Sequence, residues 1–505
     1  MKPDYVPKRE SIATDFDDGT IPSQYINTVV DAYDNDGEVS DLKEEDKAGM
    51  FLTGIGIAKN CLGTGFLNYP VIIRTWGIIP GTITILIVAS FAYFSSDFLL
   101  QCKDITRRYG YAMYGKMSMG KNGTLVLKIV LIISNFGTVC FYYKILGELI
   151  LSILSVFTDF SSESMLSSAS FYTIVCFFLL FPLIYLRGIH LLAKTSFLGV
   201  LSIIIFFICI IILFIFKSTQ PDVSIQPHFE PRMLWPCGNW IEMFVCFSAM
   251  IDSYIYKFNF FPLYLSLKPR NNSTMRKSVI LGIMLCCSVS CAVGILCFLM
   301  YGYSYDHIIE VFHKEIVNYR GVNTFILSLF VLVVVCYSLS SMLTIPLVFF
   351  SVKTNAVNLV IMLKMEFFRK KRKESGNEGV ELIDKDKEEG NNNNNNTEVN
   401  KTKTSNDNDD MNVITPFMNW IIVTLTYVAV LVCTLYVDKV ISISNFLGST
   451  ASNMVMLVYP ALFLIKLDVS NRKNILPKIS VLIGSVTFML FIVSEIQKVI
   501  DPSMT

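Results

Sequence analysis

Charged residues and histidines are scarce in this chain of 505 residues. Lysine, arginine, aspartate and glutamate together make up 16% of it, and there are only 4 histidines. We find no glycine-rich nucleotide-binding loop, no cluster of His and Cys with the spacing of a metal site, and no pairing of a nucleophile with a base. These absences argue against an enzyme, and we expect neither a cofactor nor a nucleic-acid partner.

A cleavable signal peptide and a disulfide framework are also missing. The first 46 residues hold thirteen acidic and four basic residues and no apolar core, so we expect residues 1–48 to form a disordered, acidic cytosolic tail. Nearly all of the 13 cysteines fall within apolar stretches, where cysteine behaves as a small hydrophobic residue.

Hydrophobic residues are abundant, at 53% of the chain with a mean hydropathy of +0.52. Windows of about 20 apolar residues predict an all-α polytopic membrane protein with about eleven transmembrane helices. The predicted spans lie near 49–72, 77–100, 124–157, 170–186, 191–216, 239–267, 278–301, 322–352, 413–437, 440–466 and 476–499.

Lysines and arginines gather in alternate loops, which places the N-terminus in the cytosol and the C-terminal residues 500–505 outside or in a lumen. Residues 49–353 then hold spans 1–8 and residues 413–499 hold spans 9–11. Residues 354–412 pass from a basic cluster through acidic sequence into an asparagine run, and they predict a disordered cytosolic linker. The membrane would be the plasma membrane or a vacuolar or lysosomal membrane.

The first span carries Lys59-Asn60-Cys61-Leu62-Gly63-Thr64-Gly65 and then Pro70, which is poor material for a continuous helix. A break at that depth leaves backbone groups that lipid cannot satisfy, so they must line a cavity or meet a ligand. The alternative is a seam of small residues for helix packing with a proline kink.

The sixth span is interrupted in a similar way by Asp252, Lys257, Asn259 and Pro262. Two interrupted spans, five spans apart, are typical of inverted-repeat transporters, whose substrate site lies between the broken helices. We therefore expect the binding site where spans 1 and 6 face each other.

With these motifs the chain resembles the amino acid/auxin permease family from about residue 49 to 494. The resemblance rests on the first-span motif, on Phe261-Pro262-Leu263-Tyr264 in the sixth span, on Leu343-Thr344-Ile345-Pro346 in the eighth, and on Phe446-Leu447-Gly448-Ser449-Thr450 in the tenth. It implies a five-plus-five inverted-repeat fold with broken spans 1 and 6 that transports amino acids by alternating access.

The resemblance also implies roles for individual residues. Backbone groups of the first break would bind the substrate carboxylate, and two tyrosines of span 3 would add a hydroxyl or an aromatic wall, unless they only pack. The candidate substrate-binding residues are Asn60, Gly63, Thr64, Gly65, Tyr142, Tyr143, Asp252, Ser253 and Tyr256.

Lys59 bears on the coupling ion. Proton-coupled relatives carry a lysine at this spacing, whereas sodium-coupled ones tend to have a neutral sodium ligand there. A fixed ammonium near Ser341 and Thr344 of span 8 would disfavour sodium coupling.

Asp252 has three competing interpretations: a structural pair with Lys59 or Lys257, the acceptor of the transported proton, or a ligand of the substrate's cationic group. Lys144 and Glu148, four residues apart in span 3, would form a structural pair or a proton relay.

The leading hypothesis is thus a secondary transporter of amino acids, with neutral or aromatic ones favoured, that is proton-coupled or sodium-independent. The alternatives are an amino-acid-sensing receptor that keeps the fold, and a sodium-coupled or cationic amino acid transporter.

Overall fold

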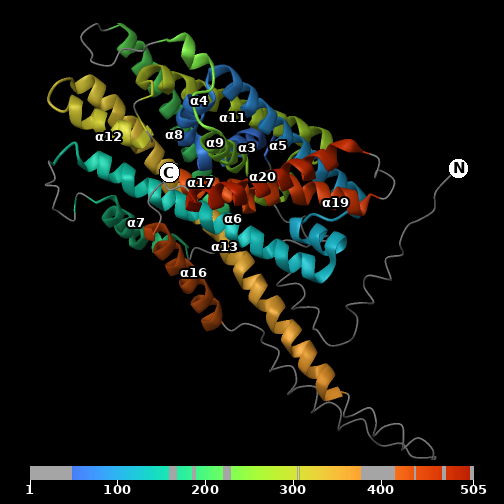
Figure 1. Ribbon diagram of the computed structural model, residues 1–505. Helices are drawn as coiled ribbons and strands as arrows, with labels where there is room; N and C mark the ends of the chain where they lie inside the picture. Colours follow the sequence, from blue (N-terminus) through green and yellow to red (C-terminus); the bar gives the residue numbers. More distant parts are fainter. Residues whose placement is uncertain are drawn as a thin grey trace, which may run out of the picture.

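The structure, a computed structural model, describes residues 48–158, 166, 168–184, 189–219, 229–303, 305, 308–376, 416–436, 440–468 and 474–500. These residues are helical almost throughout and contain no β-strand (Figure 1). The elements are α3 (Met50–Gly65), η3 (Phe66–Asn68), α4 (Tyr69–Trp76), α5 (Ile78–Thr106), α6 (Tyr111–Leu154), α7 (Ala169–Ile184), α8 (Ile189–Thr219), η5 (Pro231–Leu234), α9 (Trp240–Ser253), η6 (Lys257–Asn259), α10 (Phe260–Ser266), α11 (Asn272–Tyr301), α12 (Ile308–Tyr319), α13 (Thr324–Gly376), α16 (Pro416–Tyr436), α17 (Val440–Ser449), α18 (Ala451–Asn453), η7 (Met454–Val458), α19 (Tyr459–Leu467) and α20 (Ile475–Ile500).

Among the described residues, 7 helices are long and apolar enough to cross a membrane, or up to 9 when each of two bent pairs is taken as one span. The predicted fourth span corresponds to the shorter apolar helix α7, and the predicted sixth span is divided into α9 and α10. The all-helical membrane fold is confirmed, while the number of about eleven spans stays a prediction.

Both expected breaks are present. The first-span halves Met50–Gly63 and Phe66–Trp76 meet at 55°, and Gly65 leaves the helical region with φ −132° and ψ 2°. In the sixth span α9 ends at Ser253, and the chain is not α-helical again until Phe260. Glycine and asparagine at these points lower the cost of leaving the helix.

A third bend, in the predicted tenth span, was not expected from the sequence. Its halves Ser442–Ser449 and Ala451–Leu467 meet at 41°, at Thr450 with φ −110° and ψ −96°. The π-helical turn η7 follows after the three residues of α18. Gly448 lies so close to α9 that a β-carbon there would come within 2.5 Å of the Ser248 carbonyl carbon, which explains why glycine is needed.

The expected start of the polar linker at residue 354 is too early. Helix α13 continues to Gly376 and projects from the bundle as a straight rod (Figure 1), because residues 354–376 are rich in lysine, glutamate, methionine and leucine, which are good helix formers. The remaining linker residues, 377–412, and the tails 1–47 and 501–505 lie outside the described part of the chain.

Helix α12 lies in what the sequence indicated was a loop. It is anchored by an ion pair of 2.9 Å between Lys217 of α8 and Glu315, both of which are buried. The Lys217 ammonium also lies 4.6 Å from the centre of the Tyr301 ring, so cation–π attraction helps to offset its desolvation.

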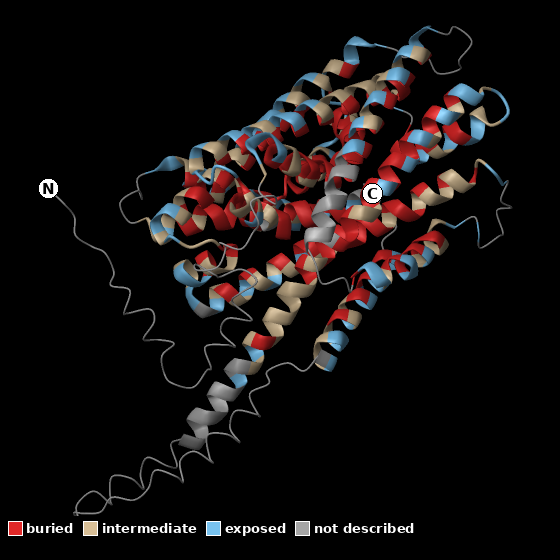
Figure 2. Ribbon diagram, turned by 180° about the vertical axis from the view of Figure 1, so that it is seen from behind, coloured by how far each residue is buried: buried red, intermediate tan, exposed pale blue. Residues whose placement is uncertain are grey.

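Packing divides the helices into groups. Helix α13 packs against both α6 and α8, whereas α11 packs against α3, α4 and α5, and α9 packs against α4 and α17. Buried residues fill the middle of the bundle (Figure 2), and large apolar side chains such as Phe178, Leu425 and Leu482 are exposed on its outer helices. An apolar outer surface is what a lipid environment requires.

The start of the first span is tied to the end of the sixth. The Ala48 amide donates to the Ser266 carbonyl at 2.8 Å, and the Lys268 amide donates to the Ala48 carbonyl at 2.9 Å. This isolated bridge joins the two broken elements at one end of the bundle.

Candidate functional site

The two breaks meet directly. A β-carbon on Gly65 would lie 2.6 Å from the Ser253 β-carbon and 3.1 Å from its α-carbon, so only glycine allows the backbones of the two breaks to approach this closely. The Ser253 hydroxyl donates to the Ala249 carbonyl at 2.8 Å. The predicted meeting of spans 1 and 6 therefore has its centre at the contact between Gly65 and Ser253.

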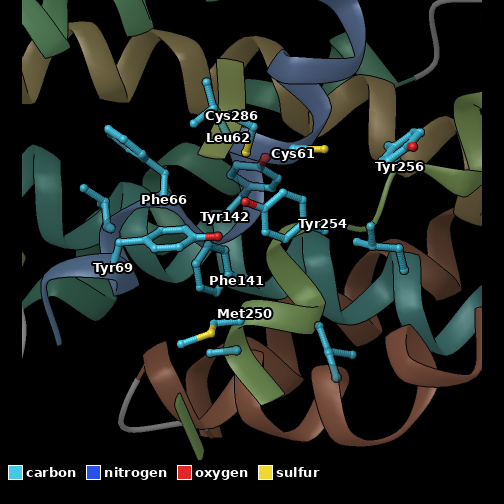
Figure 3. Close-up of a cluster of buried hydrophobic side chains, with 14 of the residues drawn as sticks. Cys61, Leu62, Phe66, Tyr69, Phe141, Tyr142, Met250, Tyr254, Tyr256 and Cys286 are labelled. Atoms are coloured by element: carbon cyan, nitrogen blue, oxygen red, sulfur yellow. The ribbon is translucent and has the colours of Figure 1, made fainter. Parts of the chain in front are cut away.

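Aromatic side chains enclose the first break. The Tyr142 hydroxyl of α6 lies against the α-carbon of Gly63, where a β-carbon would collide with it. The Tyr337 hydroxyl of α13 donates to the Gly63 carbonyl at 3.3 Å. Figure 3 shows Tyr142 gathered with Phe66, Tyr69 and Tyr254 around this break.

Phe66, at the start of η3, extends the aromatic wall. Its ring packs edge-on against Phe206 of α8 with a centroid separation of 5.0 Å and stacks on Tyr337 at 6.2 Å. The wall thus draws on η3, α6, α8 and α13.

Several predicted site residues point elsewhere. The Tyr143 hydroxyl lies 2.5 Å from that of Tyr427, on the side of α6 that faces α7 and α16. The Tyr256 hydroxyl lies 2.5 Å from the Ser96 hydroxyl of α5. Asn60, by contrast, accepts a hydrogen bond of 3.2 Å from Asn259 of η6, and this bond joins the two broken spans. The side chain of Thr64 is outside the described part of the structure.

The side chain of Lys59 extends from α3 to the place where α8 and α13 meet. A β-carbon on Gly199 would lie 2.9 Å from Cε of Lys59, 3.3 Å from its Nζ and 3.6 Å from Oγ of Ser340. The lysine head therefore reaches the position where α8 and α13 come together. Of the predicted neighbours, Thr344 donates to the Ser340 carbonyl at 2.7 Å, and Ser341 lies beside the Tyr337 hydroxyl.

Asp252 and Lys257 bond to different helices. The Ser452 hydroxyl of α18 donates to Oδ1 of Asp252 at 2.7 Å, and the Ser444 hydroxyl of α17 lies beside that carboxyl group. The Lys257 ammonium donates to the Ala92 carbonyl of α5 at 2.7 Å and to the Ser96 hydroxyl. The bonds of Lys257 thus go to α5 rather than to Asp252.

Lys144 and Glu148 are half-buried further along α6. The charges that act on the Glu148 carboxyl are those of Lys144 and of Glu310 on α12. These residues lie near the α12 end of the bundle, away from the contact between Gly65 and Ser253.

Sequence reasoning missed part of this site. Tyr337, Phe206, Ser340 and Gly199 gave no signal, because each is an ordinary residue of a continuous apolar span. The serines of span 10 did carry a signal, since serine and asparagine recur through Ser444-Asn445 and Ser449-Thr450-Ala451-Ser452-Asn453 in an otherwise apolar segment.

Residues 46–500 match the family described as "Transmembrane amino acid transporter protein". Because the match covers nearly the whole chain, the protein belongs to this family of transmembrane amino acid transporters. It is accordingly an integral membrane protein of the transporter class, and not an enzyme.

Among curated proteins, Amino acid transporter AVT6D of Arabidopsis thaliana is 24% identical over 321 residues, which are 61% of this chain and 70% of that protein. Amino acid transporter AVT6C of the same plant is 23% identical over 50% of this chain and 60% of its own. Vacuolar amino acid transporter 2 of Saccharomyces cerevisiae is 28% identical over 39% of this chain and 42% of its own length.

Two solved structures also align with this chain. One is a manganese transporter from Eremococcus coleocola, at 10% identity and a TM-score of 0.48, covering 90% of this chain and 88% of that chain. The other is MhsT in complex with L-phenylalanine, at 12% identity and a TM-score of 0.43, covering 86% of this chain and 98% of that chain.

Proposed function

We propose that the protein moves amino acids across its membrane by alternating access, with the substrate bound where the two breaks meet. The observation that carries this proposal is the contact of Gly65 with Ser253, which brings the unwound backbones of two broken spans together. Backbone N–H groups at the start of a half-helix suit a carboxylate, and carbonyls at the end of another suit an ammonium.

The substrate is a neutral amino acid with an apolar or aromatic side chain. Tyr142, Tyr337, Phe66 and Phe206 surround the first break, and aromatic rings favour apolar or aromatic groups. The Tyr142 hydroxyl, which lies against Gly63, is placed to donate to the substrate carboxylate.

Transport is independent of sodium and driven by protons. The Lys59 head lies beside Gly199 and Ser340 between three helices, and an ammonium there repels a second cation. Replacing it with a neutral residue would remove that repulsion.

The substrate class and the driving ion are tested by uptake into proteoliposomes that hold the purified protein. A pool of radiolabelled amino acids is offered with an imposed proton gradient, a sodium gradient or neither. We expect neutral and aromatic amino acids to accumulate with the proton gradient alone. Accumulation driven by sodium would contradict the proposal, and specific binding without any flux would favour a receptor.

A variant of Lys59 sharpens the test. We expect Lys59→Thr to lose proton-driven uptake by about tenfold, which corresponds to a change of about 1.4 kcal/mol in the barrier, because the fixed charge between the three helices is removed. We also expect its uptake to be stimulated by sodium. Lys314→Thr, which alters an exposed lysine of α12, is the control and should behave as the wild type. A Lys59→Thr protein that sodium does not affect would argue against this role.

A further inference from the structure

A chain of buried polar groups connects Asp252 to the first break through the tenth span. The Asp252 carboxyl group of α9 lies beside the Ser444 hydroxyl of α17, and Ser444 accepts a hydrogen bond of 3.2 Å from Nδ2 of Asn68. Asn68 is the last residue of η3, two residues after Phe66 of the aromatic wall. This series of polar groups therefore connects the second broken span to the first through α17, which belongs to neither.

A second branch leaves the same carboxyl group. Ser452 donates to Oδ1 of Asp252 at 2.7 Å, and its oxygen lies 3.4 Å from that of Ser134 on α6. Asn68, Ser444 and Ser452 have no exposed surface, and Asp252 and Ser134 are 2% exposed. The bend of span 10 at Thr450 lies between Ser444 and Ser452 and sets the position of both around Asp252.

One atom of this network is left unsatisfied. Oδ1 of Asn68 is buried and has no hydrogen-bond partner among the described residues. A buried acceptor without a donor is costly and calls for an explanation. Because Nδ2 of the same amide is bonded to Ser444, a half-turn of the amide would bring Oδ1 to the Ser444 hydroxyl instead.

We propose that Asp252 binds the transported proton and that Ser444 and Asn68 transmit its protonation to the first break. This inference rests on the proposed function. It assigns to Ser444, Ser452 and Asn68 a positioning role in ion coupling that the sequence did not suggest.

The hydrogen bonds rearrange in a balanced way. When Asp252 is ionised, the Ser452 hydroxyl donates to it, the neighbouring Ser444 hydroxyl turns its hydrogen towards it, and Ser444 accepts from Nδ2 of Asn68. When a proton from water forms an O–H bond at the carboxylate, that group donates to Ser444, and the Ser444 hydrogen then needs a new acceptor. The turned amide of Asn68 supplies Oδ1, which gains the donor that it lacks in the ionised state, while Nδ2 gives up its bond to Ser444. On the other side of the membrane the O–H bond breaks and the proton returns to water.

The ionisable groups around Asp252 are consistent with this carboxyl group being the one that changes charge when the proton binds. Helices α17 and α18 contain no charged residue, and the titratable group of α6 that acts together with Asp252 is the Tyr142 phenol. The charged residues on the other elements packed against α9 contact other groups or lie towards helix ends. They are Lys59 beside Gly199, Arg74 over the Tyr305 ring, Asp97 with Arg276, Lys103 with Asp104, Lys257 with Ala92, and Lys478, Glu495 and Lys498 towards the two ends of α20.

The test compares amino-acid exchange and proton-driven accumulation in proteoliposomes from pH 5 to pH 8. Exchange of labelled for unlabelled substrate, without any gradient, reports the carrier itself. Accumulation under a gradient of one pH unit reports coupling and can reach about tenfold for one proton per substrate. The proteins are the wild type, Asp252→Asn, Ser444→Ala and, as a matched control, Ser290→Ala, a fully buried serine of α11.

We expect the wild type and Ser290→Ala to accumulate substrate under the gradient and to exchange it with the same pH dependence. Ser444→Ala should keep exchange but lose most of the proton-driven accumulation, with a shifted pH profile. Asp252→Asn should lose accumulation, and whatever exchange it retains should no longer depend on pH.

Proton-driven accumulation by Asp252→Asn, or a Ser444→Ala protein identical to Ser290→Ala, would overturn the inference. Ser444→Ala keeps the carboxyl group and therefore decides the matter if Asp252→Asn does not fold. A wild type that exchanges amino acids but ignores the proton gradient would refute this inference and leave transport intact. A wild type that neither binds nor exchanges any amino acid would instead refute the proposed function.

Discussion

The first and sixth spans are both broken, but different kinds of residue form the two breaks. The first break is short, and it depends on glycine: Gly63 lets the Tyr142 hydroxyl approach its backbone, and Gly65 does the same for Ser253. The second break is longer and carries charge: Asp252 bonds to the tenth span, and Lys257 bonds to α5. One break offers backbone groups, and the other offers ionisable side chains.

Under the proposed function, this difference would separate substrate binding from ion coupling. Backbone groups at a glycine-rich break suit a ligand that must come very close and then leave. Ionisable side chains anchored on neighbouring helices respond to protonation and hold the second half-helix in register. We therefore expect changes in the first break to affect mainly substrate handling, and changes in the second to affect mainly coupling and stability.

The largest effect should come from Gly65→Ala. Its methyl group would lie 2.6 Å from the Ser253 β-carbon, so the breaks must separate, and displacement of about 1 Å at a binding site can cost on the order of 100-fold in rate. Uptake assays should show this loss, with partial recovery in the double variant Gly65→Ala/Ser253→Gly. Gly56→Ala is the matched control, because its methyl group would make an ordinary contact of 3.5 Å with Leu263. Equal uptake by the two single variants would refute the close-contact argument.

Lys257→Met tests the second break. Its ammonium is fully buried and donates to Ala92 and Ser96, so its loss leaves the Ala92 carbonyl without that charged donor. Hydrogen bonds to charged groups contribute about 1.5–3 kcal/mol. Thermal unfolding of the detergent-solubilised protein should show a loss of that order, whereas Lys314→Met on the surface should show none. A Lys257→Met protein as stable as the wild type would mean that the desolvation of the lysine cancels its bonds.

The smallest effect is expected from Tyr143→Phe, which is the natural comparison for Tyr142→Phe. The Tyr143 hydroxyl bonds to Tyr427 on the far side of α6, so its removal should lower the free energy of unfolding by about 1 kcal/mol and leave uptake unchanged. Tyr142→Phe should instead reduce uptake. Identical uptake profiles of the two variants would remove Tyr142 from the proposed site.

The breaks were predictable because glycine, asparagine, proline and charge inside an apolar span signal a local preference against the helix. Their contact was also predictable in outline, from the placement of two such spans five apart. The partners of Asp252 and Lys257 were not, since they depend on where α9 ends and on how the chain turns between residues 254 and 259. Ser452 and Ala92 lie 200 and 165 residues away from these charges, and no local pattern encodes such pairings.

The structure differs from the sequence-based prediction where polar sequence still forms helix. The continuation of α13 to Gly376 and the presence of α12 follow from helix propensity and from the buried pair Lys217–Glu315, neither of which hydropathy windows detect. The bend of span 10 was missed because small residues such as Gly448 are equally common at straight helix contacts.

The backbone hydrogen bonds of Ala48 to residues 266 and 268 join the start of the first span to the end of the sixth. Because these two bonds connect the N-terminal end of α3 to the C-terminal end of α10, neither half-helix can move outward by itself unless the bonds break. A cross-link between these positions would hold the protein in one conformation. Deletion of residues 1–48 would remove the bonds of Ala48, whereas deletion of residues 1–47 would keep them. Under the proposed alternating access, the few residues around Ala48 would therefore limit how far this end of the protein opens.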